Sequence, residues 1–161
     1  MKHLLNWLKN QTKMKKSDFI FEKPEESTGF LLWQVTNLWQ REIKKALEKY
    51  GLTHSQFVLL ASMHWLELDK QNSTQIVLSN HTKIDPMTTS TVLRKMQKKG
   101  LVLRKEHEND TRAKTVQLTT TGQETIKQAI QTVEQFDSSF FGKLTNETSE
   151  FNEKLMRLLE K

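Results

Sequence analysis

The chain has 161 residues and no cysteine, and its 25 lysines and arginines against 19 acidic residues give a formal net charge of +6. This length suits one domain with its own core, and the lack of cysteine excludes a disulfide scaffold, a thiolate metal site and a cysteine-based peroxide sensor. No apolar run approaches the length of a membrane span. The first apolar stretch is interrupted by Asn6 and ends at Lys9, so we expect a cytoplasmic protein with no secretory signal and no membrane partner.

The positive charges are clustered in two stretches. Residues 1–16 hold five lysines, and residues 94–105 hold six lysines and arginines, with no acidic residue in either stretch. The rest of the chain has 14 cations and 19 acids. Clustered positive charge on an acidic body predicts a polyanionic partner, although either stretch alone also fits a solvated helix face.

Helical periodicity dominates the first third of the chain. Residues 1–26 form a basic, polar extension, which is either a short docked helix or a tail. Apolar residues at steps of three and four predict a long amphipathic helix over residues 28–50. Thr53 and Gln56 have the spacing of a capping box, and the helix that they open, over residues 54–66, is apolar on most sides. Such a helix belongs at the centre of a fold.

Two short helices are predicted next. Asn72 or Ser73 caps a helix that passes through residues 76–78. An Asp-Pro pair at residues 85–86 then opens a helix that ends at Gly100. Two short helices joined by a tight turn, the second ending in basic residues, are typical of a helix-turn-helix.

A β-hairpin follows the basic helix. Residues 101–105 and 113–118 have the composition of strands, and the segment between them, residues 106–112, is polar and turn-prone. The hairpin is therefore predicted to form a wing attached directly to the helix-turn-helix.

Two further helices complete the chain. Residues 121–124 have the form of a capping box and open a long helix with an apolar stripe from Ile126 to Phe141. Thr145 is the predicted cap of a last helix, whose apolar residues run from Phe151 to Leu159. A winged-helix core leaves these helices with little to cover them, which favours a dimer interface. The alternative is that they fold back on their own subunit.

The second helix of the motif and the wing carry the candidate DNA-binding residues. In the major groove, residues near the start of a helix reach base edges, and cations further along neutralise phosphates. The candidates are Thr88, Thr89, Ser90, Thr91, Arg94, Lys95, Lys98, Arg104, Lys105, Asp110, Arg112 and Lys114. An arginine on a wing suits the narrow minor groove, and Asp110 is placed to hold the Arg112 guanidinium. Leu93 and Met96 fall on the opposite, buried face. The structural alternatives are that residues 88–91 form a polar first turn with no partner and that Asp110 and Arg112 form an exposed ion pair.

Several segments resemble the MarR family of winged-helix regulators. Residues 110–122, DTRAKTVQLTTTG, are similar to the family's Asp-x-Arg…Leu-Thr-x-x-Gly signature. Residues 98–102, KKGLV, resemble its passage from the recognition helix into the wing, and the similarity covers residues 28–160. The chain departs from the family at residues 76–79, where Ile-Val-Leu-Ser stands for a frequent Glu-Leu-Ala core, and at residues 96–97, where Met-Gln replaces Leu-Glu.

The resemblance implies a mainly α fold with a small β-hairpin wing. A winged helix-turn-helix over residues 53–120 is expected between two dimerisation segments, residues 27–52 and 121–161, after the basic extension of residues 1–26. It implies a homodimer that binds double-stranded DNA at a pseudo-palindromic operator as a repressor and that a small molecule releases. By the same resemblance Arg112 is the minor-groove arginine and Asp110 its support.

The effector site is predicted only loosely. The family's ligand cleft lies near the first helix, the core helix and the base of the long helix. The candidates for an aromatic ligand are Trp33, Trp39, Phe57, Met63 and Trp65. A plain hydrophobic core explains the same residues.

No cofactor, metal or catalytic site is predicted. The five histidines lack a metal-ligand spacing, although His54 or His64 with a carboxylate across a dimer stays open. No phosphate-binding loop or dinucleotide turn is present, so we expect a protein that is not an enzyme. Two other functions stay open. One is a winged-helix plasmid replication or architectural protein that binds repeated sites, and the other is a basic module that binds an acidic protein or a membrane surface.

Overall fold

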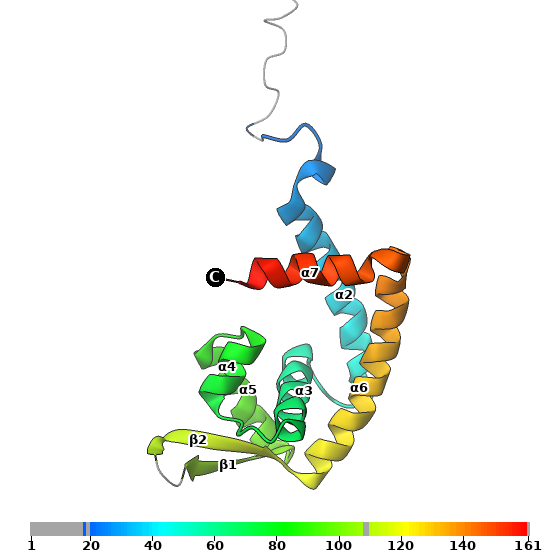
Figure 1. The fold of residues 1–161 in the computed structure, drawn as a ribbon. Helices are drawn as coiled ribbons and strands as arrows, with labels where there is room; N and C mark the ends of the chain where they lie inside the picture. The colour runs from blue at the N-terminus through cyan, green and yellow to red at the C-terminus, as the bar shows by residue number, and fades with distance from the viewer. Residues whose placement is uncertain (1–17, 19, 108–109, 161) are drawn as a thin grey trace, which may run out of the picture. The chain divides into compact units, whose positions relative to one another are not determined.

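The computed structural model describes residues 18, 20–107 and 110–160, and the side chains of these residues except those of 105–107 and 110–114. It is mostly helical with one antiparallel hairpin, which confirms the predicted fold class (Figure 1). The elements in chain order are η1 (Pro24–Glu26), α2 (Thr28–Glu48), α3 (His54–Leu68), α4 (Gln75–Thr82), α5 (Pro86–Lys98), β1 (Val102–His107), β2 (Asp110–Leu118), α6 (Thr120–Phe141), η2 (Gly142–Glu147) and α7 (Thr148–Leu159). None of these helices is both long enough and apolar enough to span a membrane.

The chain divides into two compact units, residues 1–38 and 39–161. The described part of the first unit contains η1 and the beginning of α2. The second unit contains the end of α2 and all later elements, including the winged helix of α3 to β2.

Two of the predicted helix starts are confirmed. At α3, the Thr53 hydroxyl accepts a hydrogen bond from the Gln56 amide, and the Gln56 side chain accepts one from the Thr53 amide, which is the predicted capping box. At α5, the Asp85 carboxylate accepts from the Thr88 amide and Pro86 is the first helical residue. Both caps satisfy backbone amides that have no partner within the helix.

Three other predicted caps are wrong, and for the first two a long-range contact sets the helix boundary. The cap of α4 is Thr74, since the carbonyl oxygen of Ser73 accepts from the Val116 amide and is held against the wing. The cap of α6 is Thr119, whose hydroxyl accepts from the Gly122 amide and donates to the Gly100 carbonyl oxygen. Thr145 does not cap α7, because it lies inside η2 with φ +49° and α7 begins at Thr148.

The hydrophobic core belongs to the second unit and surrounds α3. Leu59 and Leu60 of α3 are fully buried, as the sequence predicts. Every later helix up to α6, both strands and the end of α2 contribute to this core. Its largest fully buried apolar residues are Ile43, Leu47, Leu59, Leu60, Met63, Leu78, Leu93, Met96, Val102, Val116 and Ile126.

The first half of α6 packs on its own subunit. Ile126 and Ala129 are fully buried and Val133 is nearly so, and α6 contacts α3. The premise that this part of the apolar stripe is uncovered is therefore wrong, and the fold-back alternative holds for it. In α7, by contrast, Leu158 and Leu159 are exposed.

The wing is a two-stranded hairpin fixed at its base. β1 pairs with β2 with Val102 opposite Leu118, and the strands extend further toward the tip than predicted. Gly100, with φ +71°, makes the turn from α5 into β1, as expected of the residue that ends this helix. A bridge between Thr74 and Thr115 attaches the other strand to the segment before α4.

Candidate nucleic-acid interface

Helix α5 has one buried face and one polar face. Leu93 and Met96 are fully buried, which confirms the prediction for this face. The exposed residues include Thr88, Thr91 and the three cations Arg94, Lys95 and Lys98. The buried face anchors the helix in the core, so the polar face is presented to solvent along its length.

Among the serine and threonine residues of the first turns of α5, Thr89 is the one that is fully buried. Its side chain is 0% exposed, and its hydroxyl donates to the carbonyl oxygen of Ile84 at 3.3 Å. Since Thr89 lies one turn before Leu93, it shares the buried face of α5. The expectation that Thr89 contacts DNA is therefore wrong, and its hydroxyl closes the turn between α4 and α5 instead.

The start of α5 carries a fixed negative charge at its cap. The amide and the hydroxyl of Thr88 hydrogen-bond the Asp85 carboxylate, and these bonds lower the pKa of Asp85 below its usual value. A charged carboxylate at this position is favoured by the helix dipole. Thr88 thus uses both its amide and its hydroxyl at the cap, while Thr91 and the half-buried Ser90 follow on the next turn.

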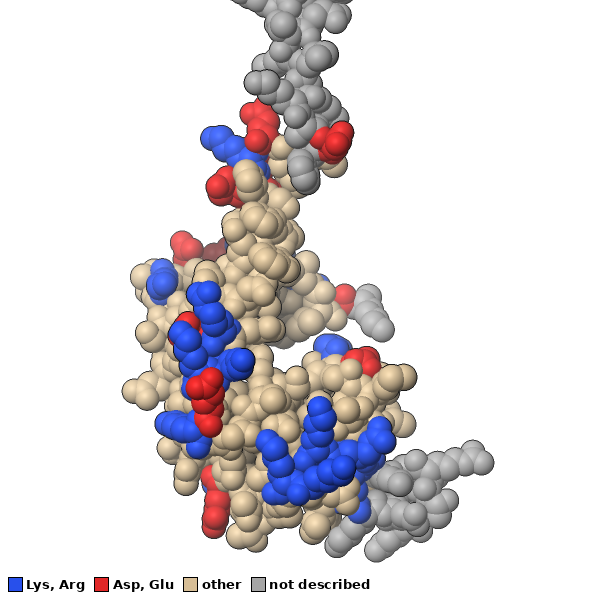
Figure 2. Space-filling view, turned by 180° about the vertical axis from the view of Figure 1, so that it is seen from behind, with Lys and Arg blue, Asp and Glu red and all other residues tan. Residues whose placement is uncertain are grey.

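The cations of α5 gather on one side of the winged helix (Figure 2). Among the side chains that the structure describes, Arg94, Lys95 and Lys98 form no ion pair with an acid. Arg94 uses its Nε only to hydrogen-bond the Ser90 carbonyl oxygen at 3.4 Å. Unpaired, exposed cations on a helix that also presents hydroxyls are suited to phosphate contacts.

Lys99 differs from the neighbouring cations because its side chain has protein partners, which no sequence pattern indicated. Its Nζ donates to the Gly51 carbonyl oxygen at 2.7 Å and to the Gln56 Oε1 at 3.3 Å. This ammonium therefore ties the end of α5 to the turn between α2 and α3. Both acceptors lie far from Lys99 in the sequence, so no local pattern could have found the contact.

Arg104 also has a protein partner. Its Nη2 donates to the Gln75 Oε1 at 3.2 Å, and its Nε is buried with no hydrogen-bond partner among the described residues. Gln75 was not among the predicted site residues. A lone glutamine at the start of a helix carries no local signal that would mark it as part of the site.

The remaining wing candidates are placed only by their backbone. Lys114 lies opposite Glu106 in the hairpin, and Asp110 lies opposite His107. The side chains of Lys105, Asp110, Arg112 and Lys114 are outside the described part of the structure, so their roles stay predictions.

The predicted ligand residues differ in their exposure. Met63 is buried and Phe57 is half-buried, whereas Trp65 is 62% exposed. Trp33 is also 62% exposed and belongs to the first unit. Trp39 donates its Nε1 to the Asp137 Oδ1 at 2.7 Å. Met63 therefore belongs to the core and Trp39 and Phe57 pack against it, whereas Trp33 and Trp65 are exposed.

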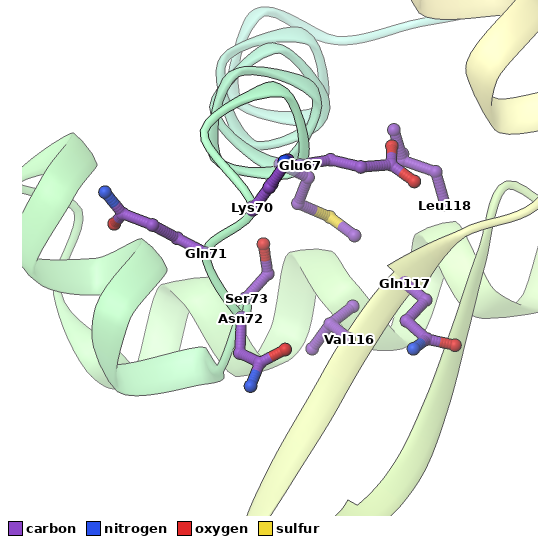
Figure 3. A pocket seen from close by; sticks show the side chains of 9 residues that line it. Glu67, Lys70, Gln71, Asn72, Ser73, Val116, Gln117 and Leu118 are labelled. Atoms are coloured by element: carbon purple, nitrogen blue, oxygen red, sulfur yellow. The ribbon is translucent and has the colours of Figure 1, made fainter.

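A cavity of about 400 Å³ lies between the end of α3 and strand β2 (Figure 3). Of the five predicted ligand residues, only Met63 lines it. Val116 and Leu118 add apolar surface on the wing side, and polar residues of the loop after α3 complete the lining. The full lining is Met63, Glu67, Lys70, Gln71, Asn72, Ser73, Val116, Gln117 and Leu118.

His54 lies in an aromatic environment. Its ring meets the Trp39 ring edge-on at 4.9 Å between centroids. Burial lowers the pKa of His54, and the nearby Asp137 carboxylate partly offsets this. Within the described residues, no group of three His, Cys, Asp or Glu residues is placed to hold a metal ion.

Comparison with known proteins places this geometry in a family. Residues 48–135 match a family model described as an ArnR1-like winged-helix domain. The chain is 40% identical over 121 residues to an uncharacterized HTH-type transcriptional regulator, YdcH, of Bacillus subtilis, covering 75% of this chain and 82% of the relative. It is 29% identical over 117 residues to an HTH-type transcriptional repressor of Mycobacterium bovis, covering 73% and 81%.

A solved structure agrees with this relationship. A mutant of MarR from E. coli, crystallised in complex with operator DNA, superposes with a TM-score of 0.71 at 25% identity, covering 83% of this chain and 93% of that one. The family consists of regulators rather than enzymes. The chain therefore belongs to the MarR family and is a transcriptional regulator with a DNA-binding winged helix.

Proposed function

We propose that this regulator binds a pseudo-palindromic operator as a homodimer and represses transcription. The winged helix of residues 53–120 would bind DNA, and residues 27–52 and 121–161 would form the dimer. The observation that carries the proposal is the division of α5, whose one face is locked into the core while the other exposes hydroxyls and unpaired cations.

In this proposal α5 enters the major groove. Thr88, Ser90 and Thr91 hydrogen-bond base edges or touch thymine methyl groups, because they lie on the first turns of the helix. Arg94, Lys95 and Lys98 neutralise phosphates. Of the wing residues, Arg112 enters the minor groove with Asp110 as its support, and Lys105 and Lys114 bind the backbone.

The homodimer is supported by apolar side chains that the chain leaves exposed. On α2 these include Leu32 and Trp33, which are 53% and 62% exposed, and on α7 they include Leu158 at 75%. Exposed large apolar residues of this kind favour association with another chain. A twofold axis would place two α5 helices about 34–36 Å apart, one turn of DNA.

The repressor role is supported by the relative from Mycobacterium bovis, which is named as a repressor. A dimer seated on an operator within a promoter blocks access of the polymerase to that DNA. Expression of this chain beside its own upstream region fused to a reporter should lower the reporter signal, and an increase would identify an activator.

The central experiment measures DNA binding against salt. Fluorescence anisotropy with a duplex selected by the purified protein from a random pool should show tight binding that weakens steeply as salt rises. Lys98→Gln should lower affinity for every duplex and reduce the slope of log K against log salt by about 1. Lys127→Gln, on an exposed position of α6, is the matched control and should change neither quantity.

Sequence discrimination is tested at Thr91. Thr91→Val keeps the shape of an exposed side chain on α5 but removes its hydroxyl. We expect a smaller ratio of specific to non-specific binding with an unchanged salt slope, because base contacts specify while phosphate contacts position. Equal affinity of the unaltered protein for all duplexes would reject an operator-binding regulator.

Release by a small molecule belongs to the proposal as well. The cavity between α3 and β2 is of a size that binds small ligands, and its lining joins the wing to the loop before α4. An occupant would touch both, so its binding can change the position of the wing. Benzoate, an aromatic anion that Lys70 would attract, should raise the melting temperature and weaken operator binding. Leu118→Trp, on the same side of β2 as Val116, should fill the cavity and remove both effects.

A further inference from the structure

One side chain connects the two elements that face DNA. The Gln75 Nε2 donates to the carbonyl oxygen of Pro86 at 3.2 Å, and the Gln75 Oε1 accepts from the Arg104 Nη2 at 3.2 Å. Gln75 is the first residue of α4, Pro86 is the first residue of α5 and Arg104 lies in β1. A single amide thus contacts the start of the helix that reads the groove and the first strand of the wing.

The backbone on either side of Gln75 is held in place. Thr74 caps α4 through its hydroxyl, which accepts from the Val77 amide at 3.2 Å, and it forms a bridge with Thr115 of β2. The carbonyl oxygen of Ser73 accepts from the Val116 amide at 2.8 Å. Gln75 therefore projects from a rigid junction between α4 and the wing, and its half-buried side chain has little freedom to move.

Arg104 is poorly placed to neutralise a phosphate. Its side chain is half-buried, one guanidinium nitrogen is used by Gln75, and its Nε is buried. Arg94, Lys95 and Lys98 are exposed and unpaired by comparison. Of the cations between residues 94 and 104 predicted to bind DNA, Arg104 alone is engaged by another side chain.

We propose that Gln75 and Arg104 are positioning residues that set the wing relative to the start of α5, and that Arg104 acts through Gln75 rather than by binding a phosphate. The inference rests on the proposed function, in which α5 and the wing bind neighbouring grooves of one duplex. Fixing their relative position before binding lowers the ordering cost that DNA binding must otherwise overcome.

The chemistry of the amide explains why glutamine suits this position. It donates with its nitrogen and accepts with its oxygen at the same time. A charged glutamate would keep the partner of Arg104 but cannot donate to Pro86, and leucine can do neither. The series Gln75→Glu and Gln75→Leu therefore removes first one contact and then both.

The test measures operator affinity by anisotropy over a range of salt concentrations, at a temperature where every variant is folded. Gln75→Leu and Arg104→Met should each weaken binding about tenfold, with an unchanged salt slope. Gln75→Glu should weaken operator binding by less than Gln75→Leu, because it keeps the contact with Arg104. The double variant should be no weaker than either single variant, because both remove the same bridge. Lys98→Gln is the control that does reduce the slope.

Three results would overturn the proposal. The first is a salt slope for Arg104→Met that is reduced by about 1, as in Lys98→Gln. The second is a loss of operator affinity in the double variant that equals the sum of the two single losses. The third is an unchanged operator affinity in Gln75→Leu.

A second measurement needs no DNA. Amide hydrogen exchange in β1 and β2 should be faster in Gln75→Leu than in the unaltered chain, because the wing loses its tie to α5. Equal exchange would also contradict the proposal. If the unaltered protein binds no operator while exchange in the wing changes as expected, the bridge stands and the proposed function fails.

Discussion

The apolar residues of the winged helix differ in burial from those on the early part of α2 and on α7. Around α3, residues such as Leu60, Leu93 and Ile126 are fully buried. On the early part of α2 and on α7, residues of the same kind, among them Leu32 and Leu158, are more than half exposed. The winged helix therefore buries its apolar residues within one chain, whereas the early part of α2 and α7 leave many of theirs exposed.

Substitutions in the buried core should affect the stability of the fold, whereas substitutions on the exposed apolar faces should affect association. A closed core tolerates little change in volume, since each buried atom already has neighbours. A substitution on an exposed apolar face leaves the fold of the monomer intact but weakens its association with another chain. The same type of substitution should therefore have different consequences in the two regions.

The largest contrast is expected between two glycines. A Cβ at Gly122 would collide with the backbone carbonyl oxygen of Leu101, whereas a Cβ at Gly29 would meet nothing. Gly122→Ala should cost about 3 kcal/mol or more, because backbone must move, and Gly29→Ala should be neutral or stabilise by up to about 1 kcal/mol. Thermal unfolding measures both, and equal effects would contradict the comparison.

The second contrast concerns assembly. Leu32→Lys and Leu158→Lys place a charge on the exposed faces of α2 and α7 and should convert a dimer into a monomer with its winged helix still folded. Leu68→Lys, at a residue that is 67% exposed at the end of α3, is the control and should stay dimeric. Sedimentation equilibrium measures the mass. A monomeric unaltered chain would remove the dimer from the proposal.

A smaller effect is expected at the cap of α6. Thr119→Ala removes the acceptor for the Gly122 amide and the donor to the Gly100 carbonyl oxygen, so it should cost about 1–2 kcal/mol. Thr121→Ala, at the cap that the sequence predicted, should change stability by less than about 0.5 kcal/mol. Urea unfolding measures the stability of both variants. A larger loss of stability for Thr121→Ala than for Thr119→Ala would favour Thr121 as the cap, as the sequence predicted.

The smallest effect concerns pH. Burial lowers the pKa of His54 in the folded chain, so the unfolded chain binds more protons. The stability from neutral His54 is present above pH 6.5 and is lost as the pH falls below that value. His54→Gln should reduce this part of the acid sensitivity. Unfolding curves between pH 7 and pH 5 test it, and identical pH profiles would show that burial of His54 carries no such cost.

Much of the fold could be predicted because its signals are local. The capping box at Thr53, the Asp85-Pro86 start and the turn at Gly100 each act within a few residues, and alternation marks the wing strands. The basic, hydroxyl-bearing α5 could be recognised for the same reason. The cap at Thr119 could not, because its hydroxyl also depends on Gly100, which lies 19 residues earlier.

The sequence by itself determined the order of the elements, the fold class and the family, since periodicity, caps and the wing signature are read along the chain. Tertiary structure alone decided that Thr89 faces the core, that Lys99 holds the turn at Gly51, and that Arg104 meets Gln75. A side chain's type limits the bonds that it can make. Which partner it finds depends on segments that only folding brings together.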